Sequence, residues 1–263
     1  MDVKDLLSAY YESYDEEGRL LSRHGQVEYL TTMRYIRRYL KPGDRILEIG
    51  PGTGRYSHAL ALEGYEVEAV ELVEHNIELF KAKTQPGEKI SIRQGTATNL
   101  SYYADDSFDI TLLLGPMYHL FTEEEAKKAL SEAVRVTKKG GVIFVSYCLS
   151  DASILAYGFI KGHIKEILEN GMLDPVTFTT FSPPEELFVL YRGEQIKALR
   201  SGLPVQPLHY VATDGYTHHM RETVDEMDDE TFQIYLRYHF AVCERADLVG
   251  ISHHSLDIFR KEE

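Results

Sequence analysis

The stretch RILEIGPGTG, residues 45–54, places three glycines directly after a short apolar run. The run has the length and composition of a buried strand, and glycines let a backbone turn sharply and approach a ligand closely. The segment from about Tyr56 to Glu63 reads as a helix, whose first N–H groups have no partner within the helix. The stretch therefore predicts a strand, a ligand-binding loop and a helix.

Strands and helices alternate outward from this stretch. Phe108 to Leu114 is almost continuously apolar, which is typical of a strand buried on both faces of a sheet. Thr122 followed by Glu125 is a capping-box pattern and predicts a helix that runs to about Thr137. The predicted strands cover residues 45–49, 65–71, 90–92, 108–114, 142–145, 208–212 and 254–259. This order predicts an α/β fold with a doubly wound parallel sheet and right-handed crossovers.

The chain of 263 residues is expected to form one domain, because the surplus over a simple sheet is too short to fold alone. We expect helices over 26–40, 151–172, 185–201 and 229–243. The predicted parts are an N-terminal helical cap (1–41), a core (42–150), a helical insertion (151–205) and a last part with two strands and helices (206–263).

The glycine spacing separates two kinds of cofactor loop. A dinucleotide loop needs G-x-G-x-x-G, but the third glycine would fall on Arg55, and Glu48 would repel a pyrophosphate. The pattern acid-x-G-x-G-x-G resembles motif I of the class I S-adenosylmethionine-dependent methyltransferases. The resemblance implies a Rossmann-like sheet of seven strands with the last one antiparallel. It also implies that Glu48 helps to hold the ammonium end of S-adenosylmethionine, and that the loop wraps its methionine part through Gly50, Gly52, Thr53 and Gly54.

Two further sites of cofactor contact follow the next strands. Glu71 ends the second strand about 20 residues after the loop, where a carboxylate accepts the hydroxyls of a ribose. The resemblance places Leu72 against the adenine ring. It also places Thr96 and Ala97 at the adenine, although many relatives have an acid where this chain has Thr96.

The segment after the fourth strand is expected to join cofactor and substrate. Relatives use the backbone here to line the cofactor, which assigns Leu114 and Gly115 to it. Tyr118 and His119 follow at the carboxyl edge of the sheet and are the candidate catalytic residues, with His119 as the candidate general base. The segment lacks the Asn/Asp-Pro-Pro-aromatic motif, so methylation of DNA amino groups is not expected.

Candidate substrate contacts lie further away in the sequence. They share a predicted position at the sheet edge or in the N-terminal cap: Tyr10, Tyr14, Tyr147, Asp214, Tyr216 and His218. No metal is predicted, because His218 and His219 are adjacent and lack a third ligand at a motif spacing. The pair His253-His254, at the start of the last strand, is assigned a structural role.

The composition of the chain limits which partners and which location are expected. The net charge of −14 disfavours nucleic acid, whose binding depends on Lys and Arg at phosphates. Cys148 and Cys243 are expected to be buried, reduced thiols. No signal peptide or apolar run of membrane-spanning length is visible, so the expected location is cytoplasmic. The sequence does not indicate an oligomeric state.

The expected activity is methyl transfer to a small-molecule acceptor, with the acceptor atom left open. Three alternatives remain at this stage. They are a methyltransferase for RNA or protein, a protein that binds S-adenosylmethionine without methylating, and a nicotinamide oxidoreductase. Glu48 and Arg55 oppose the last of these.

Overall fold

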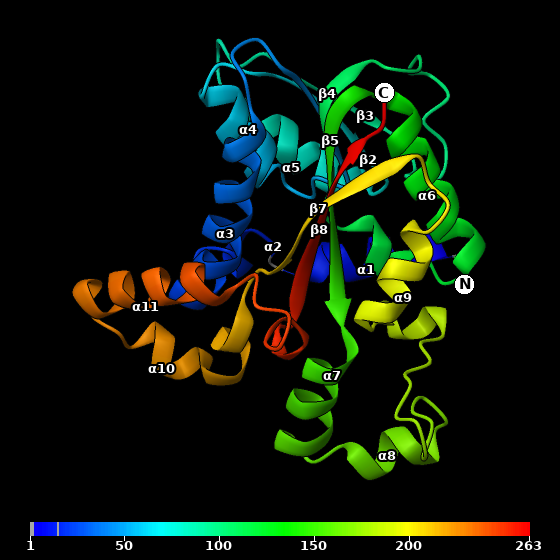
Figure 1. The fold of residues 1–263 in the computed structure, drawn as a ribbon, viewed down its shortest axis with the longest axis vertical. Helices are drawn as coiled ribbons and strands as arrows, with labels where there is room; N and C mark the ends of the chain where they lie inside the picture. The colour runs from blue at the N-terminus through cyan, green and yellow to red at the C-terminus, as the bar shows by residue number, and fades with distance from the viewer. Residues whose placement is uncertain (1–2, 15) are drawn as a thin grey trace.

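The computed structural model describes residues 3–14 and 16–263 and has a mixed β-sheet at its centre (Figure 1). The main path of the sheet has the order β3-β2-β1-β4-β5-β8-β7. Strands β1 to β5 pair in parallel, and β8 runs antiparallel to both of its neighbours, β5 and β7. The predicted doubly wound sheet with an antiparallel last strand is thus confirmed. The strands are β1 (Arg45–Ile49), β2 (Glu66–Glu71), β3 (Ile90–Gln94), β4 (Phe108–Leu113), β5 (Thr137–Leu149), β7 (Val205–Ala212) and β8 (His254–Lys261).

Helices cover both faces of the sheet. Side chains of β5 alternate between two hydrophobic clusters: Ile143 and Val145 pack on one face, and Phe144 packs on the other. The first cluster includes residues of α6 and α9, and the second includes residues of α3 and α4. The helices between the first strands are α4 (Arg55–Leu62), α5 (Glu74–Lys83) and α6 (Glu123–Val136). The Thr122 hydroxyl accepts the Glu125 N–H at the start of α6, as the capping-box pattern predicts.

The N-terminal segments form α1 (Val3–Ser13), α2 (Glu16–Arg19) and α3 (Arg23–Tyr39). Helix α3 begins three residues earlier than predicted, because Ser22 caps it by accepting the Gly25 N–H. After β7 the chain forms η4 (Gly215–Met220), α10 (Arg221–Asp225), α11 (Asp229–Val242) and η5 (Val249–Ile251). A short 3-10 helix, η1 (Pro116–His119), follows β4, and a short π-helix, η2 (Ile154–Ile160), lies in the segment after β5.

The segment after β5 is only partly helical. It contains α7 (Ser150–Ser153), η2, α8 (Ile164–Glu169), η3 (Pro184–Glu186), β6 (Leu190–Tyr191) and α9 (Gly193–Arg200). The predicted helix over 185–201 is wrong before Gly193. Leu187 has a φ of 65°, which ends the single turn begun at Pro184. Leu190 and Tyr191 then pair in parallel with the end of β5. Helices α7 and α8 project beyond the end of β5, away from α4 and α5 (Figure 1).

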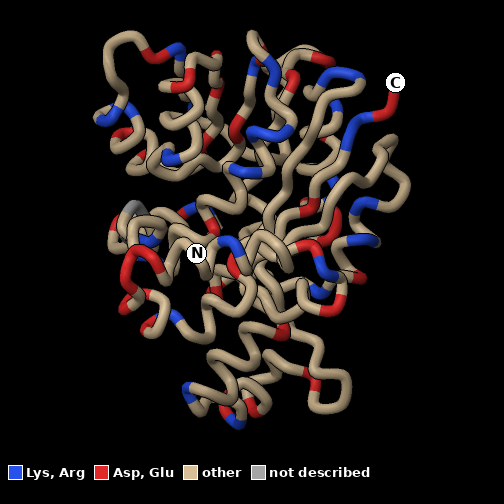
Figure 2. Tube along the Cα trace, turned by 60° about the vertical axis from the view of Figure 1, so that its left-hand side comes forward, with Lys and Arg blue, Asp and Glu red and all other residues tan. Residues whose placement is uncertain are grey.

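Charged side chains are spread over the molecule. Lys and Arg are scattered among Asp and Glu along the trace in Figure 2, and no single element gathers the net charge. Among the helices of the described residues, none is both long enough and apolar enough to cross a bilayer.

Candidate cofactor loop and acceptor cavity

The loop after β1 depends on glycine conformations. Gly50, Gly52 and Gly54 all have positive φ, between 56° and 89°. An added Cβ at Gly50 would lie 2.7 Å from Pro116, and one at Gly54 would lie 2.5 Å from the Phe80 ring. The loop therefore packs directly against the corner after β4 and against α5. Larger residues at these positions would separate those contacts.

Glu48 lies beneath this loop. Its side chain is buried and accepts a hydrogen bond from the Ser57 hydroxyl of α4. Burial raises the pKa of the Glu48 carboxyl to about 7, and the nearby Glu71 adds to the increase. In this structure Glu48 supports the start of α4 from below the loop. The expected contact with an ammonium group stays a prediction.

Glu71 ends β2 and closes onto the same loop. One carboxylate oxygen accepts the Gly52 N–H at 3.0 Å, and the other accepts the N–H groups of Leu72 and Val73 at 2.8 and 2.9 Å. Burial raises the pKa of Glu71, although these N–H groups oppose the increase. The Asn76 side chain also donates to Glu71, so four donors occupy its four acceptor positions, and a ribose hydroxyl would replace one of these donors.

The residues expected at the adenine lie at the end of β3. Gly95 N–H donates to the Glu71 carbonyl at 2.9 Å, which joins this turn to β2. The Thr96 hydroxyl lies 3.2 Å from the Thr98 hydroxyl, and Ala97 is buried. The structure thus brings Thr96 and Ala97 to the sheet edge that also carries the glycine loop and Glu71.

A cavity of about 1260 Å³ opens at the carboxyl edge of the sheet. Leu114 and Gly115, which follow β4, line its inner side. An added Cβ at Gly115 would lie 3.4 Å from the Gly50 carbonyl, so the cavity adjoins the glycine loop. The predicted substrate residues that line this cavity are Tyr10, Tyr14, Asp214 and His218, and Tyr118, which was predicted to be catalytic, lines it as well.

Two predicted substrate contacts do not reach this cavity. Tyr147 is fully buried, because β5 continues to Leu149 and the strand alternation turns Tyr147 to the face covered by α6 and α9. Its ring packs edge-on against Tyr191, with centroids 5.2 Å apart. Tyr216 lies in η4 and lines a separate small hollow formed with residues of α11. The predicted positions of Tyr147 and Tyr216 at the cavity wall are therefore wrong.

His119 has both ring nitrogens engaged. One lies 2.7 Å from the Leu187 carbonyl, and the other lies 3.0 Å from the Tyr11 hydroxyl. Burial lowers the pKa of His119 to about 4, so the imidazole is neutral at physiological pH. It then donates to Leu187 and accepts from Tyr11. His119 is not among the residues that line the cavity, and the geometry favours a role in holding α1 and the segment before β6 in place.

Tyr118 does line the cavity. Its hydroxyl lies 2.6 Å from the Ser146 hydroxyl of β5. Burial raises the pKa of Tyr118 well above its usual value, and the nearby Cys148 and Glu28 act in the same direction. The phenol is therefore neutral and can donate or accept a single hydrogen bond.

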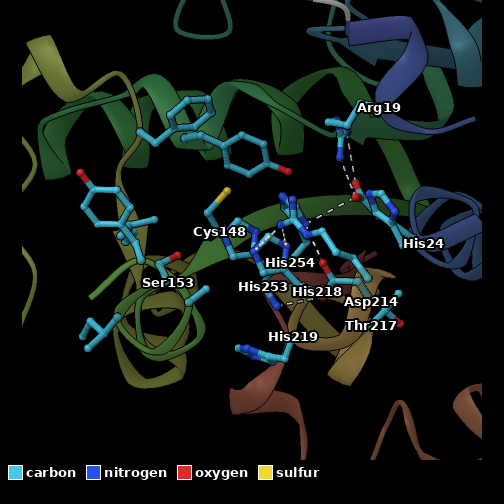
Figure 3. A pocket seen from close by; sticks show the side chains of 18 of the residues that line it. Arg19, His24, Cys148, Ser153, Asp214, Thr217, His218, His219, His253 and His254 are labelled. Atoms are coloured by element: carbon cyan, nitrogen blue, oxygen red, sulfur yellow. Dashed lines mark hydrogen bonds and ion pairs between the residues drawn. The ribbon is translucent and has the colours of Figure 1, made fainter. Parts of the chain in front are cut away.

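The sequence did not single out the group that dominates the polar wall of the cavity. His254 Nδ1 lies 2.9 Å from Asp214 Oδ2 and 3.4 Å from Glu28 Oε2. Cys148, which pairs with His254 across β5 and β8, is a buried cysteine without a disulfide, as predicted. Figure 3 shows Cys148, His254 and Asp214 in a row along the wall. One signal was available: a strand that runs antiparallel to the others begins at the edge where they end.

Asp214 is held by four donors. Oδ1 accepts the Ser252 hydroxyl at 2.5 Å and the N–H groups of His253 and His254 at 2.9 and 3.2 Å, and Oδ2 accepts His254 Nδ1. Burial opposes ionisation, but the hydrogen bond and charge of His254 prevail and hold the pKa of Asp214 well below its usual range. Asp214 is a carboxylate at every physiological pH.

Potential metal ligands meet at this wall. Ligand atoms of two sets, Asp214 with His218 and His253, and Glu28 with Asp214 and His254, lie within 4.8 Å of one another. Their partners account for this arrangement: Asp214 is saturated by donors, and Arg221 Nη2 lies 2.9 Å from His218 Nε2. A guanidinium at this distance opposes a bound cation. The geometry favours a hydrogen-bonded network over a metal centre.

Comparison with known proteins finds a matching family and relatives that are named as methyltransferases. Residues 47–145 match the family described as a methyltransferase domain. The chain is 33% identical to a demethylmenaquinone methyltransferase of Clavibacter sepedonicus over 145 residues, which are 54% of this chain and 56% of that protein. It is 27% identical to a ubiquinone biosynthesis O-methyltransferase of Pseudomonas syringae pv. tomato over 70% of this chain and 79% of that protein. The chain thus spans little more than half the length of the first of these relatives.

Solved structures show the same fold. The CcbJ methyltransferase of Streptomyces caelestis has a TM-score of 0.62 at 13% identity, with 99% of this chain and 98% of that chain covered. A methyltransferase of Thermotoga maritima, described as dependent on S-adenosylmethionine and as a possible histamine N-methyltransferase, has a TM-score of 0.58 at 20% identity. The match covers 99% of this chain and 100% of the Thermotoga maritima chain.

Proposed function

We propose that this chain is a class I S-adenosylmethionine-dependent methyltransferase and that it transfers a methyl group from S-adenosylmethionine to a small organic acceptor, as its matched segment and its fold support. When bound, the cofactor supplies an electrophilic methyl group on a sulfonium. The protein has to hold the donor and the acceptor in line and exclude water, which is the larger part of catalysis in such a displacement.

The chemistry around the glycine loop suits this cofactor. The two acids at the loop, Glu48 and Glu71, disfavour a phosphate group and favour a ligand that carries hydroxyls and positive charge. We assign the ribose hydroxyls to Glu71 and the adenine to Leu72, Thr96 and Ala97. Gly50, Gly52, Thr53 and Gly54 would surround the methionine part, with Glu48 supporting them, and Leu114 and Gly115 would line the remaining side.

One observation carries the assignment of an organic acceptor, namely the composition of the cavity that adjoins this loop. Its volume of about 1260 Å³ exceeds the roughly 300–1,000 Å³ typical of ligand pockets, so it has room for an organic acceptor. Its wall has a polar end and an apolar end. The polar end includes Glu28, Asp214 and His254. The apolar end comes from the segment after β5 and includes Ile154, Tyr157, Ile160, Ile167, Leu173 and Phe181.

Such a wall supports an acceptor with a polar head and an apolar body. The two relatives reported above are named for steps that produce menaquinone and ubiquinone, and both names point to organic acceptors. We assign Tyr10, Tyr14, Tyr118, Asp214 and His218 to the acceptor site. His119 is proposed as a positioning residue behind it.

Calorimetry with S-adenosylhomocysteine tests the cofactor. We expect micromolar binding of this product and none of NAD; the reverse result would exclude the proposal. Transfer is then tested with a cell metabolite extract and isotopically labelled S-adenosylmethionine, with the labelled product identified by mass spectrometry. Binding of S-adenosylhomocysteine without any labelled product would favour a protein that uses the fold for another reaction.

A further inference from the structure

His254 is the best-placed polar side chain in the acceptor cavity, and its two ring nitrogens face different surroundings. Nδ1 faces two carboxylates, Asp214 at 2.9 Å and Glu28 at 3.4 Å. Cys148 pairs with His254 across β5 and β8 and acts on the charge state of the imidazole.

Charge balance assigns a proton to both nitrogens. Glu28 is paired with Arg19, whose Nη1 lies 2.7 Å and Nη2 3.4 Å from its carboxylate oxygens. If His254 is protonated, the charges of Arg19, Glu28, Asp214 and His254 cancel. If His254 is neutral, Asp214 loses the cation that is in contact with it, and an unpaired buried carboxylate is costly.

The two further histidines at this wall do not supply this charge, and Arg221 contacts His218 rather than Asp214. Burial, His254 and His218 lower the pKa of His253, and burial and Arg221 lower the pKa of His218 to about 4, so both imidazoles are neutral. For His254 itself, burial opposes protonation. The charge of Glu28, the effect of the neighbouring Cys148 and the hydrogen bond to Asp214 prevail and raise its pKa well above the usual value.

The thiol is a poor partner for an imidazolium N–H. Sulfur is a weak acceptor, whereas an imidazolium makes its strongest hydrogen bonds to anionic oxygen. We propose that His254, as an imidazolium held by Asp214 and Glu28, binds an acidic oxygen of the methyl acceptor. The acceptor is then a phenol, an enol or a carboxylic acid bound as its anion, and not an amine. This inference rests on the proposed function.

The position of His254 fits this role. Tyr118, three residues after Gly115, has its ring centroid 6.2 Å from that of His254. Leu114 and Gly115 line the same cavity. The oxygen-binding N–H is therefore on the side of the cavity that adjoins the proposed cofactor site.

The reaction balances with His254 unchanged. The acceptor releases its O–H proton to solvent on binding, and its oxygen forms a bond to the methyl carbon. The carbon–sulfur bond breaks, and its electron pair returns to sulfur. Anion and sulfonium become two neutral products, and His254 keeps its proton throughout.

Binding of two isosteric probes, 4-nitrophenol and 4-nitroaniline, tests the inference in the presence of saturating S-adenosylhomocysteine. We expect the wild-type protein to bind 4-nitrophenol as the phenolate, detected by its visible absorbance at pH values where the unbound probe is still mostly protonated. His254→Gln should weaken this binding by about 10- to 100-fold, the range for a lost charge-assisted hydrogen bond. Binding of 4-nitroaniline should not change.

His209→Gln is the matched control. His209 also has a carboxylate partner, with Nδ1 2.7 Å from Glu244 Oε2, but it is not among the residues that line the cavity. Its substitution should leave both probes unaffected. Unchanged affinity for S-adenosylhomocysteine shows that His254→Gln is folded.

The outcomes separate the two proposals. If S-adenosylhomocysteine binds but neither probe binds, or 4-nitrophenol binds as the neutral phenol, or 4-nitroaniline binds equally well, the inference is wrong and the proposed function stands. If S-adenosylhomocysteine does not bind, the proposed function itself fails. An NMR titration of the histidine ring nitrogens needs no variant: His254 should be doubly protonated at neutral pH, and a singly protonated ring would overturn the inference.

Discussion

Two pairs of carboxylates lie at the carboxyl edge of the sheet, and different kinds of group surround them. Glu48 and Glu71, at the glycine loop, face a hydroxyl and backbone N–H groups, and burial raises both pKa values. Glu28 and Asp214, at the acceptor cavity, face Arg19 and His254, and the pKa of Asp214 is lowered. The carboxyl groups at the glycine loop can thus accept hydrogen bonds from neutral or cationic donors, whereas Asp214 at the acceptor cavity is held as an anion.

The difference follows from what neutralises each pair. Dipoles of N–H groups compensate a buried charge only in part, whereas a cation in contact compensates it fully. The cofactor pair is therefore expected to respond to pH and to ligand. The acceptor pair is expected to respond to the loss of its cation.

The largest effect is expected from Asp214→Asn. The substitution leaves the imidazolium of His254 with a poorer partner, and breaking a buried ion pair costs about 3–5 kcal/mol of the free energy of unfolding. Urea denaturation measures this loss in the free energy of unfolding. Asp247→Asn removes a surface partner of Arg245 and should leave the free energy of unfolding almost unchanged. Equal costs for the two variants would show that the charge of Asp214 is not structural.

Glu71→Ala tests the other pair through its ligand. Loss of hydroxyl acceptors, together with the release of the Gly52 N–H from the carboxylate, should weaken S-adenosylhomocysteine by about 100-fold. Calorimetry measures the ratio of the dissociation constants of the variant and the wild-type protein. Glu66→Ala, at the exposed start of the same strand, is the control and should bind normally. A normal affinity for Glu71→Ala would move the ribose contact elsewhere.

Glu48→Gln should change the pH dependence of stability. Burial raises the folded-state pKa of Glu48 to about 7 from a usual value of 4.5, so the folded protein holds the proton more tightly than the unfolded chain. That stabilisation is complete below pH 4.5 and is lost as pH rises through 7, with a slope of at most about 1.4 kcal/mol per pH unit. Denaturation of the variant at several pH values should show a flatter curve. A curve parallel to the wild type would contradict the assignment.

The smallest effect on cofactor affinity is expected from His119→Ala. The variant loses the contacts to Tyr11 and Leu187, which hold α1 and the segment before β6 in place. Acceptor binding should therefore weaken by about tenfold. Affinity for S-adenosylhomocysteine and the pH profile of turnover should stay unchanged. A lost ionisation in the pH profile would restore His119 as the base.

The cofactor half could be predicted from the sequence because its parts are close together in the chain. The glycine loop and α4 follow β1 directly, and Glu71 ends the next strand. Each position has a local requirement, such as a positive φ at Gly54 or an acid at the end of a strand.

The acceptor half could not be predicted in the same way. Its polar wall joins residues from α3, β5, η4 and β8, and no spacing in the sequence relates Glu28 to Asp214 or His254. Tyr147 and Tyr216 were wrongly placed because the length of β5 and the direction of η4 decide which way they face. His254 was missed because the start of a strand reads as structural until its antiparallel direction is known.

The direction of β8 also bears on how the molecule folds. This strand pairs with β5 across a loop on the order of a hundred residues, and closing such a loop is slow because its entropy is lost before the contacts form. Strands β1 to β5 are joined by short local crossovers and can associate first. The polar wall of the acceptor cavity is thus expected to form last. Denaturation that releases β8 would remove the acceptor site while the glycine loop is still intact.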